Sequence, residues 1–218
     1  MKLFLLLAFL VPSLAHAYVV PTYRDLKPAS QVMLERQTIS DADLADDDGI
    51  LNDNAGGSSA AAASVTSFLA QPDVPRNITI TPGGTTTDVE SCDIVVSGTN
   101  IKNASISETI SFAANASTKV AGLKAFKTVT SIAFPANCES GGFAATWDVG
   151  WGDVLGLKNC MDSAGDVAWA VFNDAYESTR PTCVADADEV EKNTCDINGT
   201  LDGAKDIKIM FVQNFRCL

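Results

Sequence analysis

Histidine is almost missing from this chain. The one histidine among its 218 residues is His16, which lies in a leader-like segment. Without imidazole elsewhere, the chain lacks the Ser-His-Asp and Cys-His pairs that activate most protein nucleophiles. The sequence also contains no G-x-S-x-G elbow and no phosphate-binding G-x-x-x-x-G-K-[ST] or G-x-G-x-x-G loop. We therefore expect a protein that is not an enzyme and binds no nucleotide.

Positive charge is scarce as well. The chain has 15 Lys and Arg against 27 Asp and Glu, a formal net charge of −12, which becomes −13 if Lys2 is removed with the leader. Binding to phosphates requires Lys and Arg to displace condensed counterions. The composition therefore argues against nucleic acid as a partner.

The chain has no apolar run long enough to cross a bilayer. Its longest, Leu3 to Leu14, is interrupted by Pro12 and falls short of the roughly 20 residues that a spanning helix needs. A single lysine precedes this run, and residues 15–17 (Ala-His-Ala) follow it in the small-x-small arrangement that signal peptidase cuts. We interpret residues 1–17 as a signal peptide, and we expect an exported mature protein that begins at Tyr18 and has no membrane span.

Six cysteines remain in the mature chain, and an even number in an exported protein predicts three disulfides. Many pairings are open, and the pair that closes a short loop, Cys183 with Cys195, is favoured. No C-x-x-C spacing is present and no histidine is left to complete a zinc site. In a reducing cytosol the same residues would instead be buried thiols. The candidates are Cys92, Cys138, Cys160, Cys183, Cys195 and Cys217.

An acidic run in the N-terminal quarter raises the question of calcium. An EF-hand loop with Gly49 at its sixth position would begin at Leu44 and end at Ala55, where Asp and a bidentate Glu are required. We interpret the run as a solvated acidic segment, keep Ca²⁺ as the weaker alternative, and expect no other cofactor. Its members are Asp41, Asp43, Asp46, Asp47, Asp48 and Asp53.

The composition divides the mature chain into an arm and a domain. Residues 18–53 are polar and follow no sustained period, and residues 52–64 are small and linker-like. We therefore expect an acidic N-terminal arm and linker over 18–70. Residues 71–218 are rich in Val, Ile, Thr and Phe, with frequent turn residues, which predicts an all-β domain, a β-sandwich or jelly roll. The expected strands cover 77–81, 93–97, 105–112, 125–134, 145–149, 167–173, 194–197 and 205–212.

Two kinds of residue could involve sugar. Four N-x-S/T sequons could carry glycan in a eukaryotic secretory pathway, and otherwise they serve turns and strand ends. Trp147 and Trp151 could stack on a sugar ring, and Asp148 and Asp153 beside them could act as a carboxylate pair, although sheets also use Trp in cores. We keep glycan attachment and a glycan-binding patch as alternatives. The sequon asparagines are Asn77, Asn103, Asn115 and Asn198.

Six ordered segments of the sequence carry a resemblance to a known family: 72–77, 95–99, 107–110, 121–132, 152–157 and 186–193. They resemble a family of structural proteins from tailed-bacteriophage virions. The resemblance covers roughly two thirds of the chain, and several ordered segments are more specific than one short motif. It implies a component of a particle: a capsid decoration protein, a head fibre or a tail component. It also makes a structural turn the better interpretation of the acidic segment 186–191.

Together these observations predict a structural assembly protein. We expect it to bind copies of itself or other virion proteins, and to be located in a virion or outside the cell. The alternative is a secreted surface or matrix protein that polymerises or binds glycans. The signal peptide and the cysteines favour this alternative, since phage proteins assembled in a reducing cytoplasm need neither.

Overall fold

The structure is a computed structural model that describes residues 33–56, 61–140, 144–214 and 217. The predicted signal peptide and residues 18–32 of the predicted arm lie outside the described residues. The described residues all belong to one compact unit.

The described chain forms fourteen β-strands and three short 3-10 helices, which confirms the predicted all-β class. All strand pairs are antiparallel. The strands are β1 (Met33–Ile39), β2 (Asp46–Asn54), β3 (Ala63–Val65), β4 (Arg76–Gly84), β5 (Cys92–Thr99), β6 (Ser105–Phe112), β7 (Val120–Phe126), β8 (Thr128–Phe134), β9 (Ala145–Gly156), β10 (Val167–Phe172), β11 (Ala175–Tyr176), β12 (Thr182–Val184), β13 (Thr194–Asp196) and β14 (Ile207–Gln213). The helices are η1 (Thr86–Asp88), η2 (Ala164–Asp166) and η3 (Val190–Lys192).

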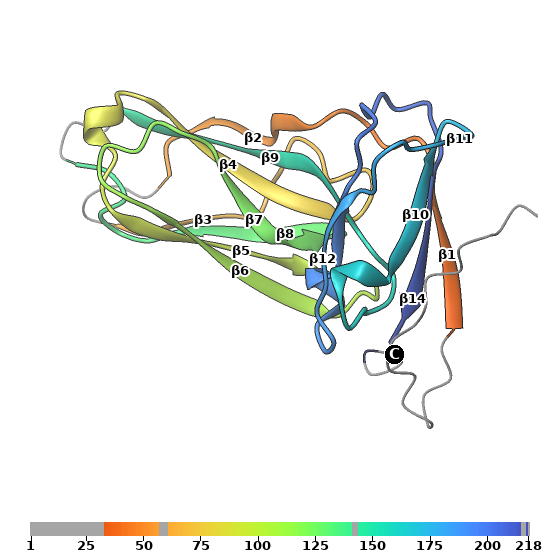
Figure 1. The fold of residues 1–218 in the computed structure, drawn as a ribbon. Helices are drawn as coiled ribbons and strands as arrows, with labels where there is room; N and C mark the ends of the chain where they lie inside the picture. The colour runs from red at the N-terminus through yellow and green to blue at the C-terminus, as the bar shows by residue number, and fades with distance from the viewer. Residues whose placement is uncertain (1–32, 57–60, 141–143, 215–216, 218) are drawn as a thin grey trace, which may run out of the picture. The chain divides into compact units, whose positions relative to one another are not determined.

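The strands form three sheets (Figure 1). Sheet A has the order β1-β14-β10-β11. Sheet B has the order β12-β13-β9-β4-β7, and β2 also pairs with β9. Sheet C has the order β3-β8-β5-β6.

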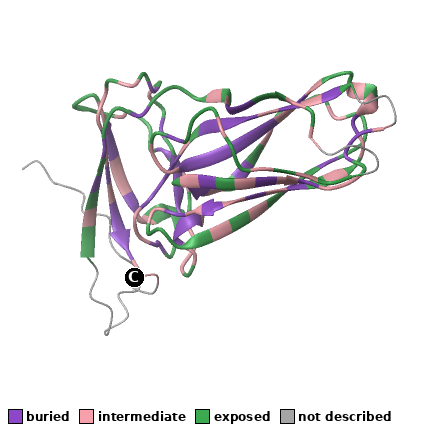
Figure 2. Ribbon diagram, turned by 180° about the vertical axis from the view of Figure 1, so that it is seen from behind, coloured by how far each residue is buried: buried purple, intermediate pink, exposed green. Residues whose placement is uncertain are grey.

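Sheets B and C form a β-sandwich around the larger of two cores. Sheet B contributes Ile78, Ile80 and Trp147, and sheet C contributes Ile94 and Phe134, all fully buried. Figure 2 shows buried residues along these strands and exposed residues mainly on outward faces and connections. The alternation of buried and exposed positions is the period of 2 expected of a sheet with one face in a core.

A second core lies against the inner face of sheet A. Ile207, Ile209 and Phe211 of β14 are fully buried there, together with Leu155 of β9. Strand β9 therefore serves both cores, because its first half carries Trp147 and Val149 of the sandwich. This long strand connects the two cores.

Part of the predicted arm and linker belongs to the sheets, and the boundary that we expected near residue 70 is wrong for the strands β1, β2 and β3 that precede it. Strand β1 pairs with β14 over its whole length, β2 pairs with β9, and β3 pairs with β8. These partners lie far along the chain, so local periodicity gave no sign of them. Only Gln37 and Ile39 of β1 are buried. Most positions of this strand can therefore be polar, and its sequence does not indicate a strand.

Most predicted strands occur, with shifted ends. Strand β6 has the predicted bounds, and β9 continues well beyond residue 149. The strand predicted over 125–134 is wrong in extent, since the chain leaves β7 of sheet B at Phe126 and enters β8 of sheet C at Thr128. The intervening Lys127 donates its backbone N–H to the Thr99 carbonyl, 2.7 Å away.

Three disulfides form, as predicted, and every cysteine is paired. Cys92 joins Cys138, Cys160 joins Cys217, and the favoured pair of Cys183 and Cys195 is confirmed. The last two residues face each other in the register of β12 and β13. Each bond stabilises the fold mainly by restricting the unfolded chain, by about 2–4 kcal/mol.

Glu108 interrupts the apolar face of β6, between Ile106 and Ile110. Its carboxylate accepts the backbone N–H groups of Leu123 and Lys124 in β7, at 2.6 and 3.3 Å. Strand β6 is an edge of sheet C and β7 an edge of sheet B. The acidic side chain thus joins two sheet edges, which explains the break in the alternation.

We predict that Glu108→Ala lowers the free energy of unfolding by about 1–3 kcal/mol, because two backbone donors lose a charged acceptor. Urea unfolding monitored by tryptophan fluorescence measures the change. Ser107→Ala, at an exposed position of the same strand, is the control and should change stability by less than about 0.5 kcal/mol. Equal stability of both variants would show that Glu108 contributes nothing to joining the sheets.

Candidate functional site

The structure does not form the predicted tryptophan patch. Trp147 is fully buried between Phe112 and Phe134, with ring centroids 5.0 and 6.1 Å away. Trp151 is also buried and donates its indole N–H to the Leu44 carbonyl at 3.2 Å. A sugar ring cannot stack on either indole, so the prediction of glycan binding by Trp147 and Trp151 is wrong. The carboxylate of Asp148 accepts the backbone N–H of Asp53.

The four sequons differ in accessibility. Asn77 is buried, and its side chain donates to the Gly122 carbonyl and accepts from the Val154 N–H. Because a glycan on this nitrogen would occupy the core, Asn77 is wrong as a glycan site in the folded protein. Asn103, Asn115 and Asn198 are exposed and keep the prediction open.

The acidic N-terminal run is divided between a loop and a strand. Asp46 opens β2, and its carboxylate accepts the N–H of Asp48. A side-chain hydrogen bond with Asp48 and burial raise the pKa of Asp46. Among residues 33–56, 61–140, 144–214 and 217, no three His, Cys, Asp or Glu side chains are placed to hold a metal ion.

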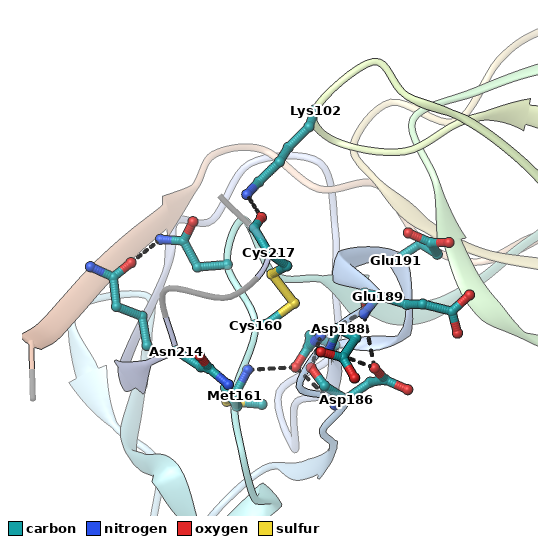
Figure 3. The surroundings of a disulfide bond; sticks show 12 residues. Lys102, Cys160, Met161, Asp186, Asp188, Glu189, Glu191, Asn214 and Cys217 are labelled. Carbon is teal, nitrogen blue, oxygen red and sulfur yellow. Dashed lines mark hydrogen bonds between the residues drawn. A yellow bond between two sulfur atoms is a disulfide. The ribbon is translucent and has the colours of Figure 1, made fainter. Parts of the chain in front are cut away.

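The second acidic cluster is a turn held by hydrogen bonds to Asn193. Figure 3 shows its acidic side chains Asp186, Asp188, Glu189 and Glu191. The buried Asn193 amide accepts the N–H groups of Met161 and Asp186 and donates to the carbonyls of Asp186 and Glu189, at 2.8–3.1 Å. The Asp186 carboxylate accepts the N–H groups of Asp188 and Glu189, which lowers the pKa of Asp186. These bonds support the interpretation of this segment as a structural turn.

Arg76 is a buried cation that the sequence did not single out. Its guanidinium pairs with Asp73 at 3.0 Å and donates to the carbonyls of Asp43 and Gly152. Burial lowers the pKa of Arg76, and the charge of Asp73 opposes that shift. The side chain therefore fixes the loop before β2 against β4 and β9, which is a structural role.

The outer face of sheet A carries large apolar side chains. The register of β1 and β14 pairs Leu34 with Val212 and Arg36 with Met210. On the other side of β14, Trp169 of β10 pairs with Met210. Leu34 is 56% exposed, although the burial of apolar surface is the main source of folding free energy.

Tyr176 of β11 extends this face. It pairs with Val171 of β10 and contacts Trp169 edge to face, with the ring centroids 5.3 Å apart. Its side chain is 71% exposed. We name the group formed by Leu34, Met210, Trp169 and Tyr176 the sheet A patch. Leu34 and Tyr176 are exposed, and Met210 and Trp169 are half-buried. Aromatic and Met side chains at a surface are typical of protein interaction sites.

The described residues thus define a disulfide-linked, all-β protein with an apolar patch on one sheet. Comparisons of the chain with protein-family models, curated proteins and solved structures found no match. Within the described residues, no helix has the length and hydropathy of a membrane span.

Glu139 is one of the carboxylates of the described residues that have an oxygen without a hydrogen-bond partner. It is buried, and its Oε1 has no hydrogen-bond partner there. Burial raises the pKa of Glu139, and the negative charge of Asp88 adds to the shift. A raised folded-state pKa means that Glu139 stabilises the fold below its unfolded pKa, and this contribution is lost as the pH rises through the folded pKa.

We predict that Glu139→Gln makes the protein more stable at pH 7, by about 1–3 kcal/mol, because a buried unpaired charge is removed. The advantage should shrink as the pH falls through the raised folded pKa of Glu139, and it should vanish below the unfolded pKa. Urea unfolding from pH 3 to 8 measures it. Glu189→Gln is the contrast. Lys192 lowers the pKa of the half-buried Glu189, so removal of this charge should not stabilise the fold. A Glu139→Gln variant that is less stable than wild type at pH 7 would contradict the prediction.

Proposed function

We propose that the chain is a structural assembly protein of a phage-like virion, as a capsid decoration protein, head fibre or tail component. The observation that carries the assembly role is the sheet A patch. The ordered segments that resemble virion proteins support the placement in a particle. The protein acts by binding copies of itself or other virion proteins, not by converting a substrate.

The patch gives this role a physical basis. A stable interface removes on the order of 1,600 Å² from water, and its central side chains are typically aromatic or Met with Arg nearby. Trp169, Tyr176 and Met210 are such side chains, with Arg36 beside them. Strand β1 adds an edge, because it is the terminal strand of sheet A. A sheet edge can pair with a strand of a second chain.

A second candidate is a secreted surface or matrix protein that polymerises through the same patch. The three disulfides favour it, since they persist in oxidising compartments. Exposed Asn103, Asn115 and Asn198 would be available for glycan there. The predicted signal peptide favours this candidate in particular, since a secreted protein must be exported.

We predict that the purified protein forms assemblies larger than a monomer, and that Leu34→Glu weakens them by about tenfold or more, because a charge is placed in an apolar contact. Light scattering coupled to size-exclusion chromatography measures mass, and electron microscopy shows form. Leu123→Glu is the matched control: Leu123 is 72% exposed on β7, outside the patch, and its change should leave assembly intact.

A monomer at all concentrations would reject assembly from copies of the chain alone. Equal loss of assembly in both variants would reject the patch as the interface. Mass spectrometry of purified phage particles and of culture medium then separates the candidates, since the virion candidate requires the chain in the particles.

A further inference from the structure

Three chemically complementary side chains meet where the β5–β6 turn, β7 and η3 come together. They are Asn100, which follows β5, Lys124 of β7 and Glu191 of η3. Asn100 and Glu191 are 4% and 8% exposed, and the Lys124 side chain is 18% exposed. Each comes from a distant part of the sequence, so no local motif predicts the cluster.

The Glu191 carboxylate bridges the other two groups. Its Oε2 accepts from Nδ2 of Asn100 at 3.1 Å, and its Oε1 accepts from Nζ of Lys124 at 3.4 Å. One carboxylate therefore contacts both an amine nucleophile and the nitrogen that would leave an amide. This is the position of a general base that later acts as a general acid.

The carbonyl oxygen of the Asn100 amide is also held. Its Oδ1 accepts the backbone N–H groups of Lys102 and Ala104, both at 3.0 Å. Two fixed donors at a carbonyl oxygen polarise the carbon and stabilise the negative charge that develops when a nucleophile adds, as in an oxyanion hole. The cluster thus contains a nucleophile, a base, an electrophile and donors for the oxyanion.

We propose that Lys124 and Asn100 form an intramolecular isopeptide bond, with Glu191 as the proton-transfer group. The Lys124 ammonium gives a proton to Glu191, and the free Nζ attacks Cγ of Asn100. The Cγ–Nδ2 bond breaks as Glu191 returns its proton to Nδ2, and the second proton lost by Nζ completes the departing ammonium ion. Atoms and charge balance, and no oxidant, reductant or cofactor is required.

The bond would link β7 of sheet B to the β5–β6 hairpin of sheet C. It is independent of the assembly role proposed above. A second Lys and Asn pair gives an internal comparison, since Nζ of Lys127 donates to Oδ1 of Asn103 at 2.8 Å on the exposed surface. In this pair the lysine contacts the amide oxygen directly, and Lys127 should remain unlinked.

The experiment is tryptic digestion of the purified full chain after reduction, alkylation and removal of any N-glycan, followed by mass spectrometry. A linked Lys124 resists trypsin, so the expected product joins residues 77–102 to residues 120–127. Its mass lies one ammonia, about 17 Da, below that of the two peptides together. Residues 77–102 and 120–124 as separate peptides, also after prolonged incubation of the native protein, would overturn the proposal and leave a buried ion pair.

Three variants test the roles. Lys124→Arg and Glu191→Gln should each lose the branched peptide while the near-ultraviolet circular dichroism of the folded protein is retained. Lys127→Arg, the matched control, should keep it. Formation of the link in folded Glu191→Gln would refute the role of Glu191, and its persistence in Lys124→Arg would assign the link to another amine.

Discussion

Most of the described fold depends on the close packing of neighbouring backbone against strand β9. Its glycines allow the approach of neighbouring segments: a Cβ at Gly150 would overlap the Asp46 carbonyl oxygen, and one at Gly152 would collide with the Asn77 side chain. Close packing of this kind leaves little room for any larger side chain. Because one half of β9 lies in the sandwich core and the other half in the sheet A core, disturbance of this strand affects both.

The sequence predicted what depends on local pattern. The bounds of β6 follow from its alternation, and Glu108, which broke the alternation, is the residue with a long-range role. Strands β1 and β2 were missed because their stabilising partners, β14 and β9, lie far away along the chain: Met33 pairs with Gln213, and Leu51 pairs with Val149. Pairing of a polar strand with a distant partner leaves no local periodicity to detect.

Candidate sites were harder to predict than strands for the same reason. From the sequence, Trp147 and Trp151 were candidates for stacking on a sugar ring, yet tertiary packing places both indoles inside the protein. Asn77 was one sequon among four until its side chain proved to link β7 and β9. Conversely, Asn100, Lys124 and Glu191 form no sequence motif. Only the fold brings Asn100 and Lys124 to the Glu191 carboxylate. One disulfide was the exception, because the short loop between Cys183 and Cys195 can be recognised from spacing, whereas the pairing of the other four cysteines was left open.

The distribution of the disulfides has a mechanical consequence. The first cysteine is Cys92, so nothing covalent ties residues 33–91 to the rest except the chain itself. Met33 pairs with Gln213, close to the crosslinked Cys217. A tensile load between the two ends would open the β1–β14 ladder one hydrogen bond at a time, as a zipper opens. The disulfide loops beyond residue 92 would resist extension. Residues 33–91 would therefore extend under load more easily than the rest of the chain.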